Sequence, residues 1–113
     1  MNTLLQQNSV ICLKSAIAYP DSGVQRQTLL EDANCRYILL SMAAGAKVAE
    51  HAASRNVTVQ GIEGQGLLTL KGKALLLEPG VLIFMPASAL HSISADTNLT
   101  VLLTLSEKVD HNP

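Results

Sequence analysis

Hydrophobic residues along this chain recur with the two-residue period of β-strands. The segment 56–64 alternates most clearly, since Val57 and Val59 are separated by Thr58 and followed by Gln60. Other segments are short apolar runs that end at glycine, at proline or at turns containing Asp or Asn, which is typical of buried strands. The pattern predicts about eight strands, over residues 23–30, 35–45 and 56–64, two within 66–80 around a hairpin turn at 71–73, and over 81–86, 90–95 and 99–105.

Short strands at regular spacing favour an all-β sandwich or barrel, with a single helical turn around residues 13–18 as the only helical signal. The chain has 113 residues, which fits one domain. We expect the barrel over residues 23–106, a lead-in segment over 1–22 that packs on it, and a polar tail over 107–113.

Composition narrows the classes of function. Hydrophobic residues make up 48% of the chain and charged residues 15%, which indicates a folded domain, and aromatic residues at 3% predict an aliphatic core. The net charge is −1 and there is no basic run, so no nucleic-acid partner is expected. No apolar run approaches the roughly 20 residues of a membrane span. We interpret Cys12 and Cys35 as reduced thiols of a cytoplasmic protein, with one bridge between neighbouring strands as the alternative.

Histidines are the main candidates for chemistry. His51 follows Gly45 by six residues, and His91 lies in a second segment that opens with a glycine, Gly80. Each of these two histidines is in or beside a segment with strand character. His111 falls in the polar tail, where a solvated side chain without a role is expected.

At these positions the sequence resembles the cupin family. The first cupin motif begins and ends at glycine and carries a His-x-His pair and a glutamate; the second contains glycine, Pro-x-Gly, histidine and asparagine. The resemblance covers roughly residues 24–105. Four positions depart from the motifs: Ala53 for histidine, Val57 for glutamate, Ser88 for glycine and Ala95 for asparagine. The motif positions that match are Gly45, His51 and Gly64 in the first motif, and Gly80, Pro86 and His91 in the second.

The chain is also similar to a group of small single-domain cupins, of the RmlC-like kind, that largely lack an assigned activity. The resemblance implies a double-stranded β-helix, or jelly-roll barrel, in which three histidines and a glutamate hold iron, manganese, zinc or nickel. Only His51 and His91 remain of that set here. A third ligand could come from Gln25, Gln27 or Cys35, or from water or a bound carboxylate.

Strand alternation extends the candidate site beyond the histidines, because side chains two residues apart share a face. If His51 points into the barrel, so does Ala53, and the same holds for the pairs Val57 and Val59, and His91 and Ile93. A neutral imidazole donates from one nitrogen and accepts at the other. We therefore predict a small-molecule pocket for an anionic or carbonyl-bearing ligand, lined by His51, Ala53, Val57, Val59, His91 and Ile93.

Two other functions stay open. One is a metal-dependent cupin enzyme, of the dioxygenase or isomerase type, with an incomplete ligand set at His51 and His91. The other is a structural or regulatory module without catalysis. Several strands are apolar on both faces, which predicts a homodimer. The N-terminal segment 1–20 could cover one outer face instead of, or in addition to, a second subunit. The glycines of 61–66 lie between strands, so they form a turn and not a phosphate loop, which needs a following helix.

Overall fold

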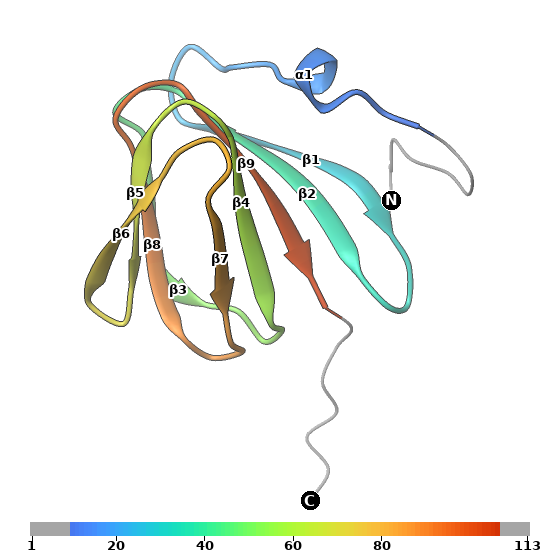
Figure 1. Ribbon diagram of the computed structural model, residues 1–113, viewed down its shortest axis with the longest axis vertical. Helices are drawn as coiled ribbons and strands as arrows, with labels where there is room; N and C mark the ends of the chain where they lie inside the picture. The colour runs from blue at the N-terminus through green and yellow to red at the C-terminus, as the bar shows by residue number, and fades with distance from the viewer. Residues whose placement is uncertain (1–9, 107–113) are drawn as a thin grey trace, which may run out of the picture.

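The computed structural model describes residues 10–106 as an all-β jelly roll built from two antiparallel sheets (Figure 1). The predicted fold class is therefore confirmed. Residues 1–9 and the predicted tail over 107–113, with His111, lie outside the described residues. In chain order the elements are α1 (Leu13–Ala16), β1 (Val24–Glu31), β2 (Arg36–Met42), β3 (Lys47–Ala52), β4 (Val57–Glu63), β5 (Gly66–Leu70), β6 (Lys73–Leu77), β7 (Leu82–Met85), β8 (Leu90–Ala95) and β9 (Leu99–Leu105).

The larger sheet has the strand order β1-β2-β9-β4-β7, and the smaller sheet has the order β3-β8-β5-β6. The last strand, β9, thus lies between β2 and β4, and β8 lies between β3 and β5. Neighbours in each sheet are therefore mostly distant in sequence, as is typical of jelly rolls. In Figure 1, β1 and β2 extend the larger sheet away from β5 and β6.

The strands predicted from the alternating pattern are all present, and one further strand, β3, was not predicted. Its sequence, KVAEHA, contains alanine and glutamate, which are depleted in strands, and its residues are exposed apart from the half-buried Val48. Its pairing with β8 stabilises the strand conformation that its own sequence does not favour. The missed strand is the one that carries His51.

One part of the interior is filled by side chains without measurable exposure. This packed half is formed by residues of β2, β4, β5, β6 and β9, which are aliphatic apart from Met42, in keeping with the aromatic content of 3%. Close packing of this kind is the main source of stability in a small domain. The residues of the packed half with 0% exposure are Met42, Val59, Leu68, Leu77, Leu99 and Val101.

The glycines of segment 61–66 serve this packing. A Cβ atom on Gly61 would lie 2.0 Å from the carbonyl oxygen of Glu78, and one on Gly66 would lie 2.3 Å from that of Ser94. Both contacts are with backbone atoms, which cannot move aside as a flexible side chain can. The segment is therefore glycine-rich because backbones approach closely there.

A chain of hydrogen bonds joins the segment before β1 to the larger sheet. The Thr100 hydroxyl donates to Tyr19 Oη at 2.9 Å, and the Tyr19 hydroxyl donates to Glu63 Oε1 at 2.7 Å. Ser41 Oγ lies 3.2 Å from Thr100 Oγ1 and therefore acts as the donor in that pair. Burial raises the pKa of Tyr19 above its ordinary value. These hydrogen bonds tie the segment around Tyr19 to the outer face of β2, β4 and β9.

The two cysteines are unbridged, and Cys12 is exposed at the start of α1 rather than on a strand. A bridge between neighbouring strands is therefore not what the fold arranges. Within residues 10–106, no helix is both long and apolar enough to span a membrane.

Candidate functional site

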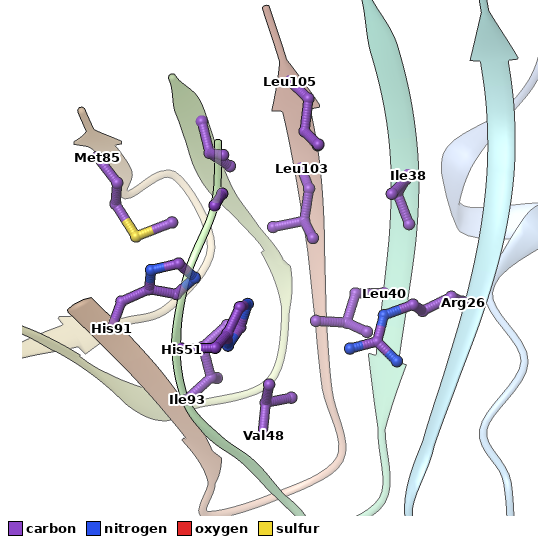
Figure 2. A pocket seen from close by; sticks show the side chains of 12 residues that line it. Arg26, Ile38, Leu40, Val48, His51, Met85, His91, Ile93, Leu103 and Leu105 are labelled. Carbon is purple, nitrogen blue, oxygen red and sulfur yellow. The ribbon is translucent and has the colours of Figure 1, made fainter. Parts of the chain in front are cut away.

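Between the two sheets, beside the packed half, lies a cavity with a volume of about 150 Å³ (Figure 2). Its wall is mostly aliphatic, with Met85 as the one thioether. Three side chains among those that line it carry nitrogen: two histidines from the smaller sheet and an arginine from the larger one. The lining residues are Arg26, Ile38, Leu40, Val48, His51, Ala53, Val57, Met85, His91, Ile93, Leu103 and Leu105.

A β-bulge in β3 sets the two histidines opposite each other. Val48 pairs with Ile93, and His51 pairs with His91. Between these two pairs β3 therefore contains one more residue than β8. Because of this extra residue, Val48 and His51 both face the cavity although they are three positions apart. The imidazole centroids are 4.3 Å apart, with an angle of 59° between the ring planes.

Each imidazole is oriented by the backbone of its own strand. Nδ1 of His51 lies 3.0 Å from the carbonyl oxygen of Ala49, and Nδ1 of His91 lies 3.0 Å from that of Ala89. A carbonyl oxygen only accepts, so in both residues Nδ1 carries the proton and donates. In the neutral imidazoles, the free nitrogen is therefore Nε2, a hydrogen-bond acceptor or metal ligand.

The pair runs from the mouth of the cavity to its interior. His91 is 5% exposed and belongs to the buried part of β8, whereas His51 is exposed on the edge strand β3. His51 is therefore the imidazole nearer to solvent, and His91 is the one enclosed by the apolar wall.

The turn before β8 connects the two histidine-bearing segments. The Ser88 amide donates to the carbonyl of Ala53 at 2.8 Å, and the Ala87 amide donates to Asn56 Oδ1 at 2.9 Å. Ser88 has φ 72°, a left-handed conformation that favours glycine. The position where the cupin motif has glycine therefore keeps the backbone of glycine here, at some cost in strain.

Five of the six predicted pocket residues surround the cavity: His51, Ala53, Val57, His91 and Ile93. The exception is Val59, which has the same inward orientation but is completely buried in the packed half. Ala53 and Val57, which stand where the cupin motif has histidine and glutamate, line the cavity beside the remaining histidines. The smaller side chains leave apolar space at these two positions.

Sequence reasoning missed Arg26. Gln25 and Gln27 pair with Ser41 and Leu39, whereas Arg26 pairs with Leu40, a cavity residue. The glutamines therefore share one face of β1, the face turned away from the cavity. The signal was present in the sequence, because Arg26 has the same parity as Val24, which packs against the core.

Cys35, the other candidate for a third ligand, precedes β2 and does not line the cavity. Its amide nitrogen donates to Asp32 Oδ1 at 3.0 Å, within the β1–β2 turn. Burial raises the pKa of the Cys35 thiol, and the nearby Asp32 raises it further, so the thiolate that a metal requires is disfavoured.

The two histidines alone fall short of the donor set of a metal site. Within residues 10–106 there is no group of three or more His, Cys, Asp or Glu side chains that could hold an ion. Catalytic zinc sites use three protein ligands, and non-haem iron sites use two histidines and a carboxylate. Two imidazoles without a carboxylate therefore do not make a self-sufficient site of either kind.

Several solved structures share this fold. A conserved protein of unknown function from Streptococcus pyogenes is 18% identical, with 97% of this chain and 98% of that chain covered and a TM-score of 0.83. A cupin superfamily protein from Desulfitobacterium hafniense is 21% identical, covering 93% of this chain and 96% of that one, with a TM-score of 0.83. An RmlC-like cupin from Desulfovibrio desulfuricans is 21% identical, covering 89% and 97%, with a TM-score of 0.78.

No protein-family model matches the sequence, and no curated protein matches it either. The likeness therefore concerns the fold.

Proposed function

From the premise that this chain has the cupin fold, we propose that it binds a small molecule in the cavity and holds the polar group of that molecule at His51 and His91. The observation that carries the proposal is the pair of backbone hydrogen bonds at Nδ1, which leaves both Nε2 atoms for a ligand. An apolar wall with a few convergent polar groups is the usual composition of a ligand pocket.

The volume limits the size of the ligand. A cavity of about 150 Å³ matches the volume of an apolar cavity known to admit benzene. It is below the roughly 300 Å³ that is the lower range for drug-sized ligands. The ligand is therefore a molecule on the scale of one ring, or an aliphatic chain of similar volume.

The hydrogen bonds also refine the ligand chemistry predicted from the sequence. A ligand carbonyl would need a donor, but the donor of each neutral imidazole is already bound to the backbone. The neutral pair offers two acceptors instead. It therefore suits a ligand that presents a hydroxyl or N–H group, such as a phenol.

Phenol and toluene form a matched pair for testing this proposal, because only phenol can donate to Nε2. We expect both to shift the methyl resonances of Ile93 and Leu103, and phenol to bind about fivefold more tightly, the worth of one hydrogen bond. His51→Asn and His91→Asn keep a donor near the position of Nδ1 but lack Nε2, so the double variant should bind the two molecules equally. If neither molecule shifts a cavity methyl, the proposal fails and a structural role gains.

A metal-dependent enzyme is the second candidate, favoured by the 4.3 Å separation of the rings and by the free Nε2 atoms. The donor set requires that the bound ligand or water complete the coordination. Protein expressed without a histidine tag should then contain close to one equivalent of iron, manganese, zinc or nickel. That metal should be lost in His51→Ala and in His91→Ala, and metal content far below one equivalent would remove this candidate.

We also propose that the protein is a homodimer. The support is a set of exposed apolar side chains on the consecutive strands β6 and β7, with Leu76 51%, Leu82 66% and Phe84 57% exposed. β7 is an edge strand, and exposed apolar edges favour self-association. Sedimentation at micromolar concentration should give twice the chain mass of 12.0 kDa. Leu82→Ser with Phe84→Ser should give the monomer, whereas Leu90→Ser, at an apolar position on β8, should not.

A further inference from the structure

We infer that the natural ligand carries a carboxylate, held by Arg26, in addition to the donor group accepted by the histidines. This inference rests on the proposed function and names the class of ligand: a small hydroxylated carboxylic acid with an apolar body.

Arg26 brings a permanent positive charge to the cavity. Its side chain extends from β1 toward Leu40 and the space between the sheets (Figure 2). Among residues 10–106 no carboxylate or hydrogen-bond acceptor contacts its guanidinium group. Arg36, on the neighbouring strand, shows the ordinary alternative, since its Nε lies 3.7 Å from Glu31 Oε2. A guanidinium presents five donors in a planar fork that matches a carboxylate.

The cavity wall itself supplies no negative charge. None of the described residues that line it is an Asp or a Glu. Glu50 adjoins His51 on β3 but is exposed and does not line the cavity, and Glu31 is engaged by Arg36. With neutral imidazoles the lining carries one net positive charge. An anionic ligand is therefore attracted, and a cationic one is repelled.

The polar groups lie on opposite walls. Arg26 comes from the larger sheet, whereas His51 and His91 come from the smaller one (Figure 2). Facing sheets are about 10 Å apart, and the side chains occupy part of that distance. A single ring with a carboxylate at one end and a hydroxyl at the other spans what remains, and its faces contact aliphatic residues such as Leu103 and Ile93.

Two ring compounds of equal size separate the contribution of charge from that of shape: 4-hydroxybenzoate and 4-hydroxybenzamide. Calorimetric titration of the wild-type chain should give about tenfold tighter binding of the acid, the usual worth of a partly exposed charge-assisted hydrogen bond. Arg26→Gln should reduce this preference below twofold without weakening the binding of the amide. Arg26→Lys, which keeps the charge but not the fork, should retain part of the preference.

Arg55→Gln is the matched control, because it makes the same chemical change at a residue that does not line the cavity. The Arg55→Gln variant should keep the tenfold preference for the acid over the amide. Loss of this preference in Arg55→Gln would show a long-range effect of net charge, which overturns the inference. Equal binding of acid and amide to the wild-type chain, with shifts at His51 and His91, overturns the inference but leaves the proposed function intact. Binding of phenol without binding of 4-hydroxybenzoate or 4-hydroxybenzamide also overturns the inference and leaves the proposed function intact. If phenol also fails to bind, both the function and the inference are refuted.

Discussion

The interior of the barrel has two halves, which are built by different strands. β5 and β6 contribute Leu68 and Leu77 to the packed half, but none of the described cavity residues. β1 and β3 contribute Arg26, Val48 and His51 to the cavity, but none of the buried residues of the core cluster. The remaining strands contribute to both halves. The packed half and the cavity thus draw on different strands of the same two sheets.

This division explains why a barrel of this size can leave a cavity. An empty apolar space costs stability through lost contacts, so it is tolerated only where the rest of the core is well packed. Here the close packing of the packed half offsets the stability lost at the cavity. The polar side chains, which would be costly in a sealed core, lie in the half that solvent can reach through the exposed Arg26 and His51.

The largest expected effect compares the same substitution in the two halves. Leu68→Ala removes a side chain with 0% exposure and should lower the free energy of unfolding by about 4 kcal/mol. Leu103→Ala widens a cavity that already exists and should cost only about 1–2 kcal/mol. Urea denaturation of both variants measures the difference. Equal losses would show that the cavity half is as tightly packed as the other half, and the barrel interior would then not be divided in this way.

A somewhat smaller effect is expected at the glycines of the packed half. Gly61→Ala places a Cβ 2.0 Å from the carbonyl oxygen of Glu78 and should cost about 3 kcal/mol, the upper range for overpacking.

Gly80→Ala is its control. Gly80 has φ 91° but nothing within 4 Å of the added Cβ, so only backbone strain of about 1–2 kcal/mol is expected. The difference between the two melting temperatures separates close approach from backbone conformation. If Gly80→Ala lowers the melting temperature more than Gly61→Ala does, backbone conformation and not close packing is the reason why this fold requires glycine at such positions.

The same division indicates how far the sequence alone could predict the fold. Strands of the packed half show clear patterns, because burial on one face forces alternation, as in Val57 and Val59. β3 was missed because it lies at the edge, where its residues are exposed and its pairing with β8 determines its conformation. Propensity is a weak guide when tertiary contacts determine the strand.

The candidate site was predictable where alternation is regular. Ala53 and Ile93 followed from the parity of His51 and His91. Val48 did not, because the bulge in β3 shifts the parity between Val48 and His51, and no residue of that segment signals a bulge. Arg26 was missed because its polar neighbours, Gln25 and Gln27, obscured the inward face of β1.

The smallest effect concerns the outer surface over the packed half. Tyr19→Phe removes the acceptor of the buried Thr100 hydroxyl and the donor to Glu63, and should lower the free energy of unfolding by about 1 kcal/mol at pH 7. Phenol binding in the cavity should not change. Tyr37→Phe is the control, because the described chain gives its hydroxyl no partner, and its effect should stay within about 0.5 kcal/mol.

The effect of Tyr19→Phe should also depend on pH. Burial raises the pKa of Tyr19 in the folded chain, so the unfolded chain releases this proton first as the pH rises through the ordinary tyrosine range near about 10. In that range the free energy of unfolding of the wild-type chain falls because of Tyr19 ionisation, which cannot occur in Tyr19→Phe. The difference in free energy of unfolding between the two chains should therefore narrow between about pH 9 and pH 11. Urea denaturation across that range measures it. A gap that stays constant would mean that the phenol of Tyr19 ionises equally readily in both states, so that Tyr19 is not shielded against the outer face of the packed half.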